Sequence, residues 1–327
     1  MSIRVLRPGL LTTVQDLGRH GHQHIGLCPG GAMDQVSLAL ANALVGNPPG
    51  APALEITVIG PELQFEHDTL VALCGAEFKG GFPHNRPMLV RAGATIAVGR
   101  AARGARAYLA VASGFAIEPV LGSCSTYLPG GFGGFEGRAL RHGDVLSPNE
   151  DVSRERFAAL KRKNGATVRW SAPPLTLPDR EPIVVHAIEG QHYGMFDSAA
   201  QRAFFDTVWR VTPESNRMGF RLGGPPLVRA AAGQSSDEIL SGPTCLGSVQ
   251  VPPSGVPIAL MADHQTTGGY PRIAEIAAAD VPRVAQMAPG ATLHFALTSL
   301  QTARELRLDA ASRLEAALRS IAWEYGM

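Results

Sequence analysis

The most polar stretch of the chain lies between Gln250 and Tyr270, where a short apolar run, 258–261, is followed by side chains of several chemical kinds. The apolar run predicts a strand, and a strand that ends in polar residues is a common mount for a functional site. The residues after it are Asp263, His264, Gln265, Thr266, Thr267, Gly268, Gly269 and Tyr270. Asp263 and His264 could act as acid or base, and Thr266 and Thr267 could donate to a developing oxyanion. A turn stabilised only by its own Asp and Thr side chains is the structural alternative.

Two arginines four positions apart, Arg217 and Arg221, lie in a glycine-flanked stretch, 216–224. A planar guanidinium binds carboxylates and phosphates through parallel hydrogen bonds. Because the neighbours are apolar or glycine, a free charge there would be costly. A ligand-binding role and a strand with solvent-exposed arginines are both open at this point.

Two further motifs have a structural and a functional interpretation. The run 129–138 holds five glycines, whose amides could form an anion nest, but Phe132 and Phe135 also fit a flexible surface loop or a flap over a cleft. His20, His22 and His24 alternate, a spacing that would place metal ligands on one face of a strand. Three imidazoles in a row do not converge on one ion, and no HExxH motif or cysteine cluster supplies a further ligand, so we interpret them as a polar loop and predict no metal site.

The composition excludes several classes of protein. The chain has 327 residues, 45% of them hydrophobic and 17% charged, with a net charge of +1. A disordered chain and electrostatic binding to nucleic acid or to an anionic membrane are therefore not expected. No apolar run is long enough for a membrane span or a signal peptide, and the four cysteines are widely separated, so we expect a cytoplasmic protein with free thiols. There is no Walker-type phosphate loop and there are only three lysines, so an oxyanion site would use arginines and backbone amides.

Short apolar runs between glycines and prolines predict a mainly β chain with a few helices. Strands are expected at 3–7, 11–15, 54–59, 63–65, 70–74, 88–90, 95–98, 106–112, 183–188, 249–251, 258–261 and 292–297. Helices are expected after Asp34, which occupies an N-cap position, and at 153–163, 198–211 (capped by Ser198) and 300–325. Composition shifts predict an N-terminal β-rich sub-domain, a proline-rich connection, a C-terminal sub-domain with the main motifs and a C-terminal helix, at 1–163, 164–182, 183–298 and 299–327.

Six ordered motifs together resemble the biotin-dependent carboxyltransferase or allophanate hydrolase subunit 2 family. They lie at 11–19, 31–34, 41–47, 216–219, 247–252 and 263–270, and the resemblance runs from Ile3 to about Phe295. The family's fold is a cyclophilin-like β-barrel, so the resemblance implies a barrel architecture in two sub-domains, with the barrel at 183–298.

The resemblance also implies an activity. Bacterial members of the family serve as the C subunit of ATP-dependent 5-oxoprolinase, a hydrolase active only as a hetero-oligomer. With the B subunit they activate 5-oxo-L-proline by phosphorylation, and the A subunit completes hydrolysis to L-glutamate; ATP would be used with Mg²⁺ bound by the complex. Other members are the equivalent half of the carboxyltransferase of a biotin-dependent urea carboxylase, using carboxybiotin carried on another chain, or a non-catalytic antagonist of a sensor-kinase inhibitor. All three alternatives are open on the sequence.

Candidate roles follow from these activities. Asp263, Arg217, His264, Thr266 and Thr267 are the candidate catalytic residues, and Arg217 or Arg221 could hold a substrate carboxylate or nucleotide phosphates. The candidate substrate- or nucleotide-binding residues are Arg221, Gln250, Gln265, Gly268, Gly269, Tyr270, Arg283 and Arg19. The chain departs from the family at Ser254, where Asn is expected, and at Arg283, where many relatives have Lys. An arginine does not deprotonate in proteins, so Arg283 is expected to bind rather than to act as a base.

Overall fold

The computed structural model describes residues 2–80, 82–149, 153–164, 168, 170–229 and 239–326. The chain divides into two compact units. The first consists of Met1–Arg19, Gly30–Leu177 and Ser312–Met327, and the second of His20–Pro29 and Pro178–Ala311. The boundary after Leu177 lies within the predicted connection, of which 165–167 and 169 fall outside the described residues. The assignment of residues 20–29 to the second unit and the division of the C-terminal helix were not expected from the sequence.

The first unit is built on two antiparallel sheets that enclose an apolar core. The five-stranded sheet has the order β2 (Leu11–Gln15), β3 (Ala53–Thr57), β8 (Arg100–Val111), β5 (Thr69–Lys79) and β6 (Pro87–Val90). The four-stranded sheet has the order β7 (Thr95–Ala97), β4 (Glu62–Phe65), β1 (Ile3–Arg7) and β9 (Val145–Leu146). Strand β1 shows why the pattern folds this way: Ile3 and Val5 are buried in the core, whereas Arg4 between them is exposed.

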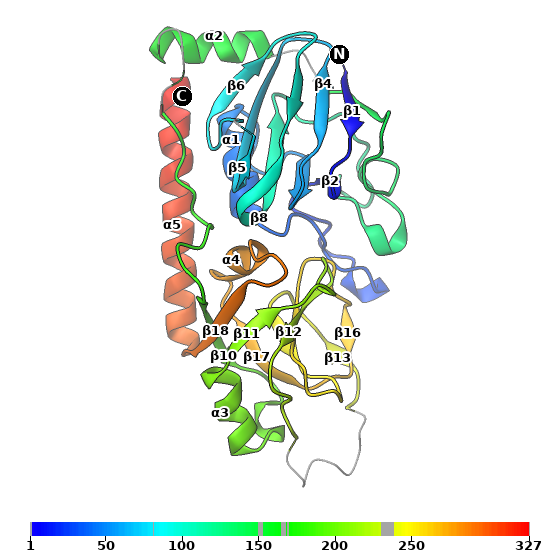
Figure 1. Ribbon diagram of the computed structural model, residues 1–327, viewed down its shortest axis with the longest axis vertical. Helices are drawn as coiled ribbons and strands as arrows, with labels where there is room; N and C mark the ends of the chain where they lie inside the picture. Colours follow the sequence, from blue (N-terminus) through cyan, green and yellow to red (C-terminus); the bar gives the residue numbers. More distant parts are fainter. Residues whose placement is uncertain are drawn as a thin grey trace. The chain divides into compact units, whose positions relative to one another are not determined.

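Helices cover the other face of the five-stranded sheet. Helix α1 (Gln35–Leu44) packs on β5 and β8, and Figure 1 shows it beside these strands. The predicted cap is confirmed, because the Asp34 side chain accepts a hydrogen bond from the Ser37 amide. Helix α2 spans Ser153–Asn164, as expected. Ala317 and Ile321 of helix α5 (Leu300–Tyr325) join the same apolar cluster, and the bounds of this helix match the prediction.

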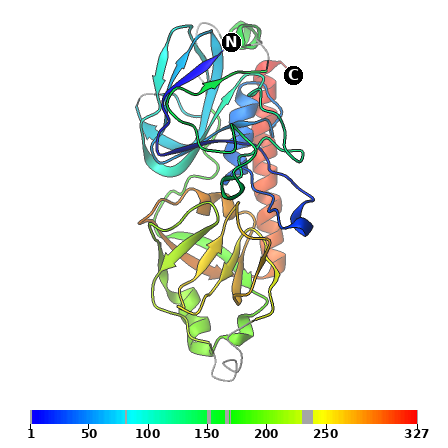
Figure 2. The ribbon, with the colours of Figure 1, turned by 90° about the vertical axis from the view of Figure 1, so that its right-hand side faces the viewer.

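The second unit is a closed seven-stranded barrel, visible in Figure 1 and Figure 2. Its strand order is β10 (Ile183–Glu189), β17 (Arg272–Ile276), β14 (Ser248–Gln250), β15 (Ile258–Leu260), β12 (Gly219–Gly223), β11 (Val208–Val211) and β18 (Thr292–Leu297). Among the described strands of the barrel, β10 and β18 are the one pair that runs parallel. A short ribbon of β13 (Gly242–Pro243) and β16 (Thr267–Gly268) lies outside the barrel sheet. The expectation of a mainly β chain with a barrel is confirmed.

The remaining helices are short. Helices α3 (Ser198–Asp206) and α4 (Val281–Ala285) belong to the second unit, and three 3₁₀ turns, η1 (Gln23–Ile25), η2 (Leu128–Gly130) and η3 (Tyr193–Met195), complete the elements. Among the helices of the described ranges, none has the length and apolarity needed to cross a bilayer.

One helix prediction was wrong in its extent. The helix expected at 198–211 ends at Asp206, and the rest of that segment is strand β11, which pairs with both β12 and β18. Alternation explains the strand, since Trp209 and Val211 are buried while Val208 and Arg210 are exposed. The N-cap is Asp197 rather than Ser198, because the Asp197 side chain accepts from the Ala200 amide.

Candidate functional site

A buried ion pair joins the two polar motifs of the barrel. Arg217 lies just before β12 and Asp263 just after β15, and the Asp263 amide donates to the Arg217 carbonyl at 2.8 Å. Nε of Arg217 lies 2.8 Å from Oδ2 of Asp263, and Nη2 lies 2.9 Å from Oδ1. Both side chains are buried, with exposed fractions of 4% and 1%. The expectation that Arg217 holds a substrate carboxylate does not match this geometry, because its guanidinium already binds Asp263 in that way.

The ring of His264 is held in one tautomer. Its Nδ1 lies 2.7 Å from the Gln265 carbonyl, which can only accept, so Nδ1 carries the proton and Nε2 keeps the lone pair in the neutral ring. Burial lowers the pKa of His264, opposed by the hydrogen bond to Gln265 and by the charge of Asp263. The buried imidazole is therefore neutral near pH 7, with its lone pair at Nε2.

Thr244 supports this arrangement and was missed by sequence reasoning. Its hydroxyl donates to the Gln265 carbonyl and lies 3.3 Å from Nδ1 of His264, and its amide donates to the Thr266 carbonyl at 2.9 Å. The pairing of β13 with β16, with Gly242 opposite Gly268, brings Thr244 to this position. Only the fold reveals this contact, because Thr244 lies outside the polar motif and follows a glycine and a proline with no chemical pattern of its own.

Two glutamines pack beneath the glycines of the motif. Nε2 of Gln265 donates to Oε1 of buried Gln250 at 2.9 Å, and Nε2 of Gln250 lies 3.5 Å from the Tyr270 carbonyl. A Cβ at Gly268 would lie 2.7 Å from Nε2 of Gln250, so a larger residue there would displace the end of the Gln250 side chain.

The outer surface of the same motif is accessible. Thr267 and Tyr270 are exposed, and Thr266 and Gly269 are half-buried. The structure thus brings together most of the predicted residues of the second unit: Gln250, Asp263, His264, Gln265, Gly268 and Tyr270 through side-chain or backbone contacts, with Arg217 held to Asp263.

Two other predicted arginines of the second unit make different contacts. Arg221 is exposed on β12, where its backbone pairs opposite Ile258 and its amide donates to the Ser215 hydroxyl. Arg283 lies on α4, and its contacts are with the Val184 carbonyl and the Asp280 carboxylate. Neither guanidinium touches the 263–270 motif through any hydrogen bond or ion pair in the described part of the chain.

Arg19 belongs to the first unit and is fully buried there, with an exposed fraction of 1%. Its Nη2 donates to the Ser125 carbonyl, and its guanidinium lies 4.9 Å from the centroid of the Phe132 ring. The neighbouring Asp16 carboxylate accepts from four groups, the amides of Gly18 and Cys124 and the hydroxyls of Ser123 and Ser125. Arg19 therefore fastens two loops together, a role that differs from the predicted ligand contact.

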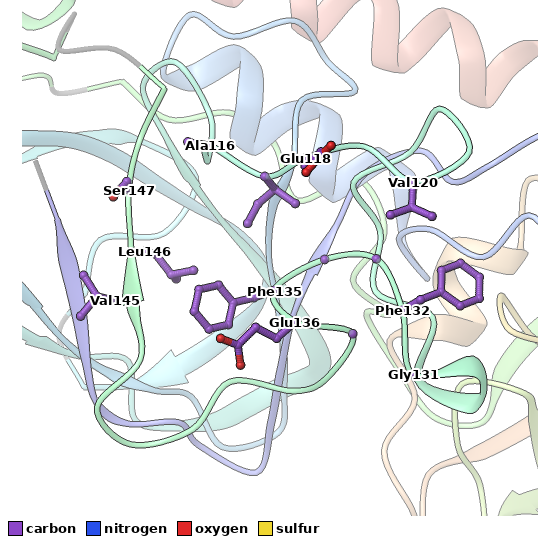
Figure 3. A pocket seen from close by; sticks show the side chains of 14 residues that line it. Ala116, Glu118, Val120, Gly131, Phe132, Phe135, Glu136, Val145, Leu146 and Ser147 are labelled. Carbon is purple, nitrogen blue, oxygen red and sulfur yellow. The ribbon is translucent and has the colours of Figure 1, made fainter.

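The glycine-rich run 129–138 forms one wall of a cleft of about 440 Å³ in the first unit. Figure 3 shows the Phe135 ring directed toward Leu146, whereas Phe132 points away on the side of Val120. The glycines are required: a Cβ at Gly133 would lie 2.3 Å from the Ser125 carbonyl oxygen, and one at Gly134 would lie 1.8 Å from the Thr126 hydroxyl. The run is a packed wall fixed by these close approaches.

The histidine run 20–24 leads into 3₁₀ helix η1, with His20 and His24 exposed. No group of three His, Cys, Asp or Glu side chains that could hold a metal ion occurs within residues 2–80, 82–149, 153–164, 168, 170–229 and 239–326.

The barrel, its polar motif and the sequence define the class of protein. The chain belongs to the family described as carboxyltransferase domain, subdomain A and B, which it matches over residues 25–297. It is 40% identical to the C subunit of 5-oxoprolinase from Escherichia coli (strain K12) over 312 residues, which cover 94% of each chain. It is 33% identical to the urea amidolyase of Lachancea kluyveri over 94% of its own length, but over only 17% of that protein. The crystal structure of the Kluyveromyces lactis urea carboxylase superposes with a TM-score of 0.85 at 31% identity, covering 97% of this chain and 29% of the larger one.

Proposed function

We propose that this chain is the C subunit of an ATP-dependent 5-oxoprolinase, which acts with the A and B subunits on 5-oxo-L-proline in the cytoplasm. The observation that carries the proposal is the match to the E. coli 5-oxoprolinase chain over 94% of both proteins. The urea amidolyase, by contrast, is matched over 17% of its length, so most of that protein has no counterpart in this chain.

The proposed chemistry makes a stable amide reactive. A lactam resists water because its amide is resonance-stabilised. Transfer of the γ-phosphoryl group of ATP to the lactam oxygen turns that oxygen into part of a leaving group and makes the ring carbon electrophilic. Hydrolysis then breaks the ring C–N bond and yields L-glutamate, ADP and phosphate, and the A subunit completes this step.

We assign His264 the role of base in the activation step. As the lactam oxygen is phosphorylated, the ring N–H becomes acidic, and Nε2 of His264 offers a lone pair for its proton. Support comes from the tautomer, which the 2.7 Å contact to the Gln265 carbonyl fixes, and from the lowered pKa of the ring. Arg217 and Asp263 act as positioning residues that hold the two strand ends on either side of the motif.

The exposed part of the motif is the surface we propose for the substrate. Thr267 and Tyr270 are accessible and carry hydroxyl groups that could contact the lactam or its phosphorylated form, and exposed Arg221 is a candidate for the carboxylate or phosphate. Mg²⁺ would accompany ATP in the complex.

A second candidate function rests on a structural observation. The TM-score of 0.85 with the K. lactis urea carboxylase favours a carboxyltransferase role, with carboxybiotin carried on another chain. In that case His264 would take a proton from the acceptor amide nitrogen as CO₂ is transferred, and the same exposed motif would bind the acceptor.

Reconstitution with the companion subunits distinguishes the two functions. We expect ATP hydrolysis and glutamate release that depend on 5-oxo-L-proline and on this chain, and a loss of at least about 100-fold in His264→Gln. His294→Gln, at a half-buried histidine on β18, is the matched control and should keep full activity. Carboxylation of urea with no turnover of 5-oxo-L-proline would favour the carboxyltransferase. Tight binding to a partner with neither activity would favour the antagonist of a kinase inhibitor.

A further inference from the structure

A cleft of about 400 Å³ in the second unit has no residue of the 263–270 motif in its lining. It is lined by Asp179, Arg180, Ile183, Val184 and Arg283. These residues come from the segment that leads into β10, from β10 itself and from α4, which Figure 1 labels. Two of the five carry guanidinium groups, whereas only one carries a carboxylate.

The guanidinium of Arg283 is held from one side only. Its Nη1 donates to the Val184 carbonyl at 3.0 Å and to Oδ1 of Asp280 at 2.6 Å. Asp280 is buried, and its Oδ2 accepts from both the amide and Nδ1 of His186, at 2.7 and 2.8 Å. Nε and Nη2 of Arg283 make no hydrogen bond to any residue that the structure describes. The Arg283 side chain is thus held in place before any ligand binds, and its Nε and Nη2 remain available as hydrogen-bond donors.

Arg180 provides a second guanidinium with unused donors. It is exposed and forms no hydrogen bond or ion pair within the described ranges. The chain next to it is anchored, because the Glu181 carboxylate accepts from both the amide and the hydroxyl of Thr292 at 3.1 Å. The base of Arg180 is therefore fixed at the cleft, while its long side chain remains free to close on a ligand.

We propose that this cleft is a binding site for a phosphate group, either free phosphate or the phosphates of a nucleotide. An arginine fork with two parallel donors matches two oxygens of a phosphate, and a second guanidinium supplies further charge. The Asp280 carboxylate is not part of the lining and already accepts hydrogen bonds from Arg283 and His186, so Asp179 is the one carboxylate among the lining residues. The inference goes beyond the proposed function, since it concerns what this chain binds by itself.

Calorimetric titration of the isolated full chain tests this site, with inorganic phosphate, ATP and 5-oxo-L-proline as separate probes. We expect Arg180→Ala and Arg283→Ala each to weaken phosphate or ATP binding roughly 10-fold to 100-fold, the usual range for a hydrogen-bonded charge. Arg283→Lys keeps the charge but loses the fork and should fall between wild type and Arg283→Ala. Arg304→Ala removes an exposed arginine of α5 and is the matched control for net charge.

Each outcome decides the question. ATP binding much tighter than phosphate binding, with the same dependence on both arginines, supports a nucleotide; equal affinities support free phosphate. Arg180→Ala keeps the test valid if Arg283→Ala unfolds, because Arg180 is exposed and supports no other contact in the described part of the chain. Absence of binding to both phosphate compounds, binding only of 5-oxo-L-proline, or an equal loss in Arg304→Ala would overturn the proposal. None of these results requires the complex to be active, so the site can fail independently of the proposed function.

Discussion

Arg217 and Asp263 lie 46 positions apart in the sequence and form a two-point ion pair that is almost completely buried. Their backbones are also joined, by the hydrogen bond from the Asp263 amide to the Arg217 carbonyl. The end of β15 and the start of β12 are thereby fixed relative to each other, and the polar motif that begins at Asp263 starts from a rigid point. A rigid backbone at Asp263 helps to keep the ring of the next residue, His264, in one orientation and one tautomer.

Breaking this ion pair should destabilise the protein strongly. Arg217→Ala leaves the Asp263 charge buried without its partner, and Asp263→Asn does the same to Arg217, so we expect each to lower the free energy of unfolding by about 3–5 kcal/mol. Urea unfolding followed by circular dichroism measures this. Replacing both residues with apolar ones, Arg217→Met with Asp263→Leu, should recover most of the loss, because no charge is left unpaired. Single variants that cost less than about 1 kcal/mol would show that the pair does not hold the strand ends.

Substitution of Thr244 should impair the positioning of the His264 imidazole without lowering the stability of the fold. Thr244→Val removes the hydroxyl that donates to the Gln265 carbonyl and lies 3.3 Å from Nδ1 of His264, which leaves the His264 ring held less firmly, by the Gln265 carbonyl. In the reconstituted complex we expect kcat to fall roughly 10-fold and the acidic limb of the pH profile to move, as for other misplaced general bases. Thr244→Ser keeps the hydroxyl and should restore both. An unchanged pH profile in Thr244→Val would contradict the positioning role.

The glycine-rich wall offers a matched pair of substitutions. Gly131 and Gly134 both have positive φ, at 66° and 57°, so alanine strains the backbone at either position. A Cβ at Gly131 meets nothing within 4 Å, whereas one at Gly134 lies 1.8 Å from the Thr126 hydroxyl. We expect Gly131→Ala to cost about 1–2 kcal/mol and Gly134→Ala distinctly more. Equal melting temperatures for the two variants would show that the backbone at Gly134 can shift to accommodate a Cβ at little cost.

Acid should destabilise the protein through two histidines, the half-buried His84 and the buried His264, that are neutral in the folded chain. Burial lowers the pKa of His84 and of His264, and Nε2 of His84 accepts a hydrogen bond from the Phe78 amide, which protonation would break. The unfolded chain then binds more protons than the folded one below about pH 6.5, the ordinary pKa of histidine. The free energy of unfolding should therefore be constant above that pH and decrease as the pH falls toward 5.

His84→Gln and His264→Gln test this sign. Each should flatten the decrease between pH 6.5 and pH 5, when urea midpoints are measured at several pH values. His24→Gln, at an exposed histidine of η1, is the control and should leave the slope unchanged. A free energy of unfolding that rises on acidification in the wild-type chain would contradict the assignment.

Local sequence patterns predicted many of the strands and helices. Alternation located β1 and β18, the flanking turn residues located β2, and the Asp34 cap and the apolar stripe of α5 located two helices. The helix expected to reach 211 failed because the chain pairs with two strands from distant parts of the sequence. Such pairing overrides local propensity and leaves no local trace beyond a weak alternation.

The candidate site stays a prediction, but the structure shows contacts of its residues that the sequence did not indicate. The sequence placed Arg217 among apolar neighbours and left open whether it is exposed or binds a ligand, and it did not indicate that the partner is Asp263. Arg19 gave the same ambiguity, since a motif arginine that fastens two loops has the same local pattern as one that binds a substrate. The role of Thr244 could not be predicted from the sequence, because it depends entirely on the pairing of β13 with β16.

The proposed role of this chain in 5-oxo-L-proline hydrolysis is open to a direct measurement. Glutamate release from 5-oxo-L-proline and ATP by the companion subunits can be followed with and without this chain. We expect release only when this chain is present, coupled to equivalent ATP hydrolysis, and reduced at least about 100-fold when the chain carries His264→Gln. Equal release without this chain, or no release from a fully assembled complex, would contradict the proposed role.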